Sequence, residues 1–484
     1  MKLPNKARKH VVVIGGGISG LAAALRLVEL EPALQVTLLE AGPTLGGVLQ
    51  TVHRDGFLIE RSADNFVSEP PWAVDLCRRI GFAHELIPTS SEQRRAMVVR
   101  RGRLRRLPVG FSLMAPTRIW PLLTTRVLSP LGKLRLLGEY FIRPRTNGPE
   151  ESLGEFARRR LGREAFERIV QPLVGGIYTA DPEKLSLRAT LPRFLEMEQR
   201  HGGLIRAARH QPQNVVAEAC DELASGARYG LFVTPREGLA SLVEAIARRL
   251  PHDSLRVNAP VEAISRLPDG AWQIRLPADR TSPASMTTDG LIVAVPAHAA
   301  ASLLTDVDGS LADELRRIPY AGSVVVSLGY RRDQVAHRLD GFGFVVPAVE
   351  KRQILAGSFA SVKFAGRAPG DAVLVRVFIG GACQSELVQL GDDQLRELAA
   401  DELKSLLGTR AAPLVCDIAR WPASMPQYHV GHCELVESIE RRAATLPNFA
   451  LAGNAYHGVG IPNCIHSGEQ AAERVLAALR AGRS

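Results

Sequence analysis

The sequence predicts an α/β protein whose central domain is assembled from distant parts of the chain, with other domains inserted into its connections. Near the N-terminus, the apolar run Val11–Ile14 precedes three closely spaced glycines and an Ala/Leu-rich segment, a pattern typical of strand, tight turn and helix. Near the C-terminus, residues 448–454 predict another buried strand, followed by a loop and a helix from about Ser467 to Leu479. Because 484 residues with 46% hydrophobic content suffice for two or three cores, the intervening segments are expected to form domains of their own.

The N-terminal turn fits the dinucleotide-binding pattern G-x-G-x-x-G, with Gly15, Gly17 and Gly20 at its glycine positions. Gly15 allows the tight turn, Gly17 lets the backbone approach a pyrophosphate, and Gly20 lets helix and strand pack closely. The acidic residue expected about 20 residues later is Glu40, which follows a second strand at Val36–Leu39 and could accept hydrogen bonds from a ribose. The alternative interpretation is a purely structural turn.

A second glycine pair, Gly46-Gly47, offers another stretch of bare backbone beside a pyrophosphate. It resembles the glycine pair of FAD-dependent oxidases and desaturases related to amine oxidases. Many of those flavoproteins have an Arg after the pair, whereas this chain has Val48, so that phosphate contact is not carried over. A simple turn after the second strand is the alternative.

The net charge of +10 is concentrated in one segment. Residues 92–145 contain thirteen basic and two acidic residues, a net charge of +11. Such a segment suits an anionic substrate, an anionic membrane surface or a solvated basic face. Nucleic acid is not expected as a partner, because the aromatic residues that would stack on bases are sparse.

The six cysteines form no C-x-x-C pair and fit no zinc spacing, so we expect reduced thiols and no metal site. The apolar run near the N-terminus is the predicted strand rather than a signal peptide, and no stretch of about 18 apolar residues lacks charges. The expected location is cytoplasmic. A peripheral position at the inner face of the cell membrane stays open, because segment 112–143 suits a helix on a membrane surface and a packed helix pair equally.

Changes of pattern along the chain predict three parts. The nucleotide-binding domain is expected from residues 1–92, 226–305 and 440–484. A substrate-binding domain with an antiparallel sheet is expected from residues 93–110, 206–225 and 306–439, and a helical subdomain from residues 111–205. Within them, a hairpin is expected to turn at Arg101-Gly102, and Ser152 is expected to cap a helix.

Two longer motifs carry a specific resemblance. The stretch QPLVGGIYTADPEKLSL at 171–187 and the stretch LAGNAYHGVGIPNCIHSG at 451–468 closely resemble signatures of the oxygen-dependent porphyrinogen oxidases of heme biosynthesis. Together with the N-terminal motifs and residues 341–347, the resemblance covers essentially the whole chain. It implies a Rossmann-like FAD-binding domain, noncovalent FAD because residues 450–454 contain no cysteine, and O2 as electron acceptor.

The resemblance also implies site residues. The residues expected to bind FAD are Gly15, Gly17, Ile18, Ser19, Gly20, Glu40, Ala41, Gly46, Gly47, Val261, Gly453, Asn454, Val459, Gly460 and Ile461. Those expected beside the substrate are Arg95, Ala96, Gly175, Phe344 and Phe359. No side chain is assigned a catalytic role, because flavin N5 accepts the hydride and aromatisation supplies the driving force.

The implied reaction is the six-electron oxidation of coproporphyrinogen III or of protoporphyrinogen IX to the porphyrin, producing H2O2. In mitochondrial and chloroplast members an Arg commonly anchors a propionate where this chain has Ala96, preceded by Arg94 and Arg95. That departure and the seven arginines between residues 94 and 106 favour coproporphyrinogen III, which has four carboxylates.

Other functions stay open on the same scaffold. One alternative enzyme is a flavin amine oxidase or carotenoid desaturase, and an alternative of another class is a non-catalytic flavoprotein partner of the heme pathway. A hand-off of the porphyrin to the next heme-pathway enzyme is a further expectation.

Overall fold

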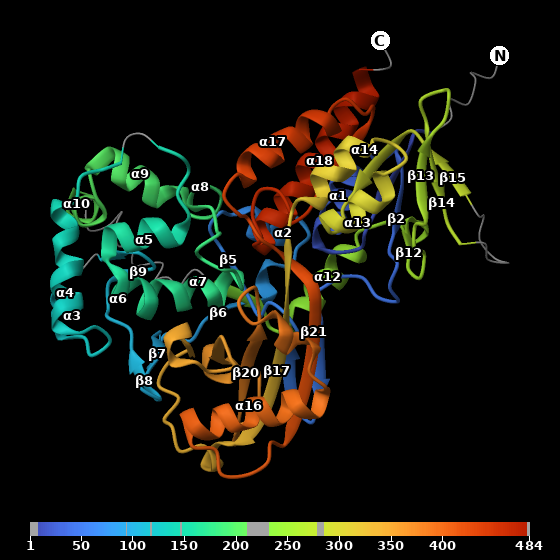
Figure 1. The fold of residues 1–484 in the computed structure, drawn as a ribbon. Helices are drawn as coiled ribbons and strands as arrows, with labels where there is room; N and C mark the ends of the chain where they lie inside the picture. The colour runs from blue at the N-terminus through green and yellow to red at the C-terminus, as the bar shows by residue number, and fades with distance from the viewer. Residues whose placement is uncertain are drawn as a thin grey trace, which may run out of the picture.

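The computed structural model describes residues 8–92, 94–116, 119–145, 148–210, 232–277 and 285–481, and within them the chain has a mixed α/β fold. Figure 1 shows a helical part on one side, a parallel sheet with its covering helices on the other, and a long second sheet beneath them. Part of the predicted substrate-binding segment, residues 211–225, lies outside the described residues.

The parallel sheet has the strand order β12-β2-β1-β16-β22, and every neighbouring pair is parallel. Its strands are β1 (His10–Ile14), β2 (Gln35–Leu39), β12 (Leu255–Arg256), β16 (Gly290–Val293) and β22 (Phe449–Leu451). The side chains of Val11, Val12 and Val13 are fully buried, as a central strand covered on both faces requires. The sheet therefore joins the two ends of the chain to its middle.

Two helices cover one face of this sheet, and each packs closely against its neighbours through a glycine. A Cβ atom on Gly20, in α1 (Ile18–Leu30), would lie 1.9 Å from the carbonyl oxygen of Gly15. A Cβ atom on Gly468, in α18 (Ile461–Ala481), would lie 2.1 Å from the carbonyl oxygen of Ser19. Both contacts exclude any side chain larger than hydrogen.

The start of α18 corrects one prediction. The helix expected from about Ser467 begins at Ile461 and includes Pro462 in its first turn. Proline is tolerated there because the N–H that it lacks has no partner within the helix.

The second sheet has seven strands in the order β21-β17-β20-β19-β18-β7-β8. They are β7 (Ala96–Arg100), β8 (Arg103–Arg106), β17 (Tyr320–Arg331), β18 (Gly343–Val345), β19 (Ala356–Phe359), β20 (Ala372–Gly380) and β21 (Val415–Pro426). The hairpin turn at Arg101-Gly102 is confirmed. The prediction of an antiparallel sheet is wrong for one pair of strands. β7 comes from a remote segment of the chain and pairs parallel to β18.

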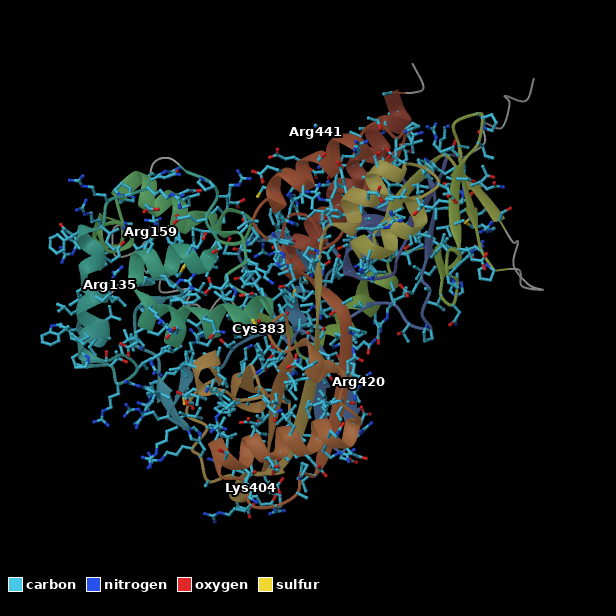
Figure 2. All side chains as sticks on the ribbon, viewed as in Figure 1. Arg135, Arg159, Cys383, Lys404, Arg420 and Arg441 are labelled. Atoms are coloured by element: carbon cyan, nitrogen blue, oxygen red, sulfur yellow. The ribbon has the colours of Figure 1, made fainter. Side chains whose placement is uncertain are left out.

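The helical part comprises α3 (Ile119–Thr124), α4 (Pro130–Leu137), α5 (Leu153–Leu161), α6 (Arg163–Ala165), α7 (Gln171–Tyr178), α8 (Leu187–Thr190), α9 (Pro192–His201) and α10 (Leu204–His210). Ser152 caps α5 in a capping box with Glu155, which confirms that prediction. Figure 2 shows Arg135 on α4 and Arg159 on α5; the Arg135 guanidinium donates to the carbonyls of Arg159 and Arg160 and so joins the two helices.

The remaining helices and strands complete the fold. They are β3 (Thr51–Arg54), β4 (Phe57–Glu60), β5 (Phe66–Val67), α2 (Trp72–Arg79), β6 (Leu86–Pro88), β9 (Phe111–Ser112), β10 (Ala115–Pro116), β11 (Phe232–Pro235), α12 (Leu239–Ala247), β13 (Ala263–Arg266), β14 (Trp272–Arg275), β15 (Ser285–Thr288), α13 (Ala297–Leu304), α14 (Gly309–Arg316), α15 (Ala360–Lys363), α16 (Asp392–Leu407) and α17 (His432–Ala443). No helix of the described residues is long and apolar enough to cross a membrane.

The contact at Gly468 predicts a strong effect of a single methyl group. Gly468→Ala should lower the free energy of unfolding by about 1–3 kcal/mol, because α18 must move away from the Ser19 carbonyl. The matched control is Gly309→Ala in α14, where a Cβ meets nothing within 4 Å; it should leave stability unchanged or raise it by up to about 1 kcal/mol. Urea unfolding of both variants tests this, and equal midpoints would contradict the contact.

Candidate functional site

A cavity of ≈ 1620 Å³ lies where the parallel sheet, the second sheet and the helical part meet. Ligand pockets for drug-sized molecules measure about 300–1,000 Å³, so this cavity can hold a larger ligand or two ligands together. Its lining is largely apolar and includes the aromatic residues Phe232, Phe342, Phe344, Phe378 and Trp421.

The glycine turns form one wall of the cavity. The Gly46 N–H donates to the Gly16 carbonyl at 2.8 Å, which brings the second glycine pair against the first turn. The Glu40 carboxylate accepts from the N–H groups of Gly16 and Gly42, both at 2.7 Å. A Cβ on Gly17 would meet nothing within 4 Å, so the bare backbone there faces open space.

The first turn of α1 is available to a ligand. Gly17 precedes the helix without a side-chain cap, so the first N–H groups of α1 have no partner within the helix. These N–H groups and the positive end of the helix dipole suit a phosphate.

The C-terminal loop forms another part of the wall, where Gly453, Asn454, Val459 and Gly460 line the cavity. Ile461 lines it too and begins α18, so two helix N-termini lie at the same cavity. Two positive helix ends favour an anionic ligand or one that gains negative charge during a reaction.

Tyr428 holds this loop in place and was missed by the sequence analysis. Its hydroxyl donates to the Asn454 carbonyl at 2.5 Å and accepts from the Gly458 N–H at 2.8 Å. Its ring stacks on His432 at 4.0 Å, and burial raises the pKa of Tyr428. Burial also lowers the pKa of His432 to about 4, so that the stacked imidazole is neutral at pH 7.

A buried charge cluster forms a third part of the lining. Asp64 Oδ1 lies 3.1 Å from Lys363 Nζ, and Asp64 Oδ2 lies 3.2 Å from Arg376 Nη1. Burial alone would raise the pKa of Asp64, but the two cations lower it to about 2. These three groups together carry one excess positive charge, and Arg376 also interacts electrostatically with the buried carboxyl group of Glu60. The three residues lie far apart in the sequence and fit no motif, so nothing local indicates them.

The structure gathers most of the predicted site residues. Those that line the cavity are Gly15, Gly17, Ile18, Ser19, Glu40, Ala41, Gly46, Gly47, Val261, Gly453, Asn454, Val459, Gly460, Ile461, Ala96 and Phe344. Gly20 does not line it but packs α1 against the first turn.

The structure places three of the predicted substrate residues off the cavity wall. Arg95 is exposed, and its carbonyl accepts the Phe342 N–H. Phe359 is fully buried behind Phe344. Gly175 does not line the cavity, whereas its neighbours Gly176, Ile177 and Tyr178 do.

The site contains little that could act as a nucleophile or metal ligand. No group of three or more His, Cys, Asp or Glu side chains that could hold a metal occurs among the described residues. Burial raises the pKa of the cavity-lining Cys464 to about 12, so its sulfur stays a thiol. The arrangement of bare backbone, Glu40 and two helix ends fits a dinucleotide, and the apolar remainder fits a flat hydrophobic ligand beside it.

Comparison with known proteins identifies similar flavin-containing oxidoreductases and porphyrinogen oxidases. The model of a family described as flavin containing amine oxidoreductase matches residues 18–476. A coproporphyrinogen III oxidase from Bacillus subtilis (strain 168) is 33% identical, with coverage of 97% of this chain and 98% of that protein. A chloroplastic protoporphyrinogen oxidase from Nicotiana tabacum is 30% identical, with coverage of 97% and 86%. A crystal structure of a candidate protoporphyrinogen oxidase from Exiguobacterium sp. 255-15 has a TM-score of 0.85 at 30% identity, with coverage of 96% and 98%.

The two hydrogen bonds of Tyr428 give a direct prediction. Tyr428→Phe leaves the part-buried Asn454 carbonyl and Gly458 N–H without this partner, at a cost of about 1 kcal/mol for each group. The loop should then loosen and flavin should bind about tenfold more weakly or worse. Tyr330→Phe is the control, since Tyr330 is also buried but does not line the cavity. Flavin titration followed by fluorescence measures both, and equal affinities in the two variants would exclude this role of Tyr428.

Proposed function

This chain belongs to the family of flavin-containing amine oxidoreductases, and from that premise we propose that it is an FAD- and oxygen-dependent porphyrinogen oxidase of heme biosynthesis. The observation that carries the proposal is the meeting of two motifs at one cavity. Residues Gly176–Tyr178 of the first motif line the same space as Gly453, Asn454 and residues 457–461 of the second. These are the two stretches that resemble porphyrinogen oxidases most specifically.

The cofactor in this proposal is noncovalent FAD. The Gly15–Gly20 turn, the Gly46-Gly47 pair and Glu40 would hold its adenylate and pyrophosphate, with Val261 beside the adenine. The loop 453–461 would hold the isoalloxazine. When bound, FAD supplies a two-electron acceptor for a hydride removed from a meso carbon of the porphyrinogen. The neutral Cys464 thiol supports noncovalent binding, because a thiol with a pKa of about 12 is a poor nucleophile.

The protein's own residues would bind and orient the substrate. The aromatic lining excludes water and offers a flat apolar surface to the macrocycle. The net positive charge of the Asp64–Lys363–Arg376 cluster would attract a propionate or stabilise negative charge that develops nearby. Three rounds remove three hydrides and three protons, that is six hydrogen atoms in all, and three O2 molecules are reduced to three H2O2. The porphyrin would pass to the next heme-pathway enzyme.

The division into domains that we propose assigns the two ligands to different parts of the protein. We assign the FAD to the parallel sheet with α1 and α18, and the substrate to the space between the seven-stranded sheet and the helical part. The hairpin β7–β8 forms the edge of that seven-stranded sheet, next to β18.

The proposed substrate is coproporphyrinogen III rather than protoporphyrinogen IX. The Bacillus relative that is named for coproporphyrinogen III is more similar to this chain than the tobacco relative named for protoporphyrinogen. Ala96 lines the cavity without a charged group, so a propionate anchor of the chloroplast kind has no side chain there.

The experiment is a side-by-side rate measurement with both porphyrinogens in air. We expect a porphyrin absorption band with each substrate and a kcat/KM about tenfold higher for coproporphyrinogen III, the effect of one further charge-assisted carboxylate contact. A higher kcat/KM for protoporphyrinogen IX would contradict the substrate assignment. Turnover of an amine or a carotene with neither porphyrinogen oxidised would favour the alternative enzymes, and flavin binding without any turnover would favour a non-catalytic partner.

We also propose that the protein is cytoplasmic and that its helical part rests on the inner surface of the cell membrane. Trp120, Leu131, Leu134 and Phe141 are large apolar residues that are 77%, 79%, 68% and 79% exposed. Exposed apolar residues grouped on neighbouring helices and flanked by arginine suit a membrane interface.

Binding to vesicles tests this surface. Leu131→Ser with Leu134→Ser should reduce co-sedimentation with anionic phospholipid vesicles several-fold, because two apolar contacts with the acyl region are lost. Leu414→Ser is the control, since Leu414 is 53% exposed outside the helical part. Wild-type protein that stays in the supernatant would contradict the proposal.

A further inference from the structure

We propose that the protein has a second binding site, separate from the cavity, that takes a phosphate group. A cleft of ≈ 390 Å³ is lined by arginines alone, namely Arg100, Arg101, Arg103, Arg105 and Arg126. The first four come from the hairpin β7–β8, and Arg126 comes from the loop between α3 and α4. None of the five lines the large cavity, which β7 reaches only through Ala96 and Met97.

The hairpin register places the guanidinium groups on one side. Arg100 pairs directly with Arg103, and Arg105 pairs with Val98, so Arg100, Arg103 and Arg105 share one face of the ribbon. Arg106 belongs to the other face and forms an ion pair with Asp340. Like charges directly opposite each other on a two-stranded ribbon are destabilising. A bound anion would relieve that repulsion.

The nearby carboxylates are engaged with other groups. Glu350 accepts the backbone N–H groups of Arg101 and Gly102, at 2.9 and 3.1 Å. Glu164 accepts the N–H and hydroxyl of Ser129, at 2.9 and 2.5 Å. Among the residues that the structure describes, no carboxylate lies within ion-pair distance of the five guanidinium groups of the cleft.

The surroundings of Arg100 agree with an unneutralised cluster. Burial lowers the pKa of Arg100, and the positive charge of Arg168 lowers it further, while Glu164 opposes both. The Arg100 guanidinium also donates to the Arg126 carbonyl, which ties the hairpin to the helical part. The cleft is therefore built from two separate segments of the chain.

The chemistry of the lining selects phosphate. Arginine binds phosphate oxygens with two parallel N–H donors, and several arginines around one small cleft match a group with three or four oxygens. A volume of ≈ 390 Å³ leaves room for a phosphate or pyrophosphate group together with part of the molecule that carries it. The group could belong to a soluble phosphate or to a phospholipid headgroup. This site does not depend on the proposed oxidase function.

Calorimetry with sodium pyrophosphate at constant ionic strength tests the site. Arg103→Gln with Arg105→Gln should weaken binding about tenfold or more, since two charge-assisted contacts are lost. The control is Arg106→Gln, on the same hairpin but the other face, which should bind like wild type. A parallel sedimentation with phosphatidylcholine vesicles, with and without phosphatidic acid, separates the two phosphate sources. Binding of pyrophosphate supports a soluble phosphate, and binding that needs phosphatidic acid and is lost in the double variant supports a headgroup.

Three results would overturn the proposal. One is wild-type protein that binds neither probe. The second is an equal loss of binding in the Arg106→Gln control, because this would reflect overall charge rather than a site. The third is a raised KM for coproporphyrinogen III in the double variant with pyrophosphate affinity unchanged, because the arginines would then serve substrate carboxylates.

Discussion

The close approach of α1 and α18 is the constraint on which the candidate site depends. The two helices come from opposite ends of the chain and meet where Gly468 lies against the Ser19 carbonyl. Because this contact leaves no room for a side chain, the N-terminus of α1 and the N-terminus of α18 are brought to one cavity. The N-terminal turn alone offers a place for phosphates, and only the second helix completes a site that accommodates a larger ligand.

The distribution of charge separates the two sites. The sequence concentrates its excess of positive charge in residues 92–145, yet the structure places four of the five arginines of the hairpin away from the cavity, in a cleft of their own. The cations that the described residues place in the cavity wall are Lys363 and Arg376, and Asp64 balances one of them. A buried carboxylate between two cations holds them in position at a lower desolvation cost than two unpaired charges.

The sequence predicts the part of the site that depends on local backbone chemistry. Gly15, Gly17 and Gly46 are recognisable because tight turns and bare backbone require glycine, and all three line the cavity. Tyr428 and the Asp64–Lys363–Arg376 cluster could not be predicted, because their partners are remote in sequence and no spacing rule joins them. Arg95 was expected beside the substrate because it directly precedes Ala96. Side chains of successive residues alternate between the two faces of a strand, so Arg95 is exposed while Ala96 lines the cavity.

The most direct test of the proposed oxidase function is to measure the reduction of bound flavin by coproporphyrinogen III in the absence of oxygen. We expect the absorbance of the oxidised flavin to be lost on mixing and to return on admission of air while porphyrin accumulates. Flavin absorbance that stays unchanged after anaerobic mixing with the porphyrinogen would contradict the proposed oxidase function.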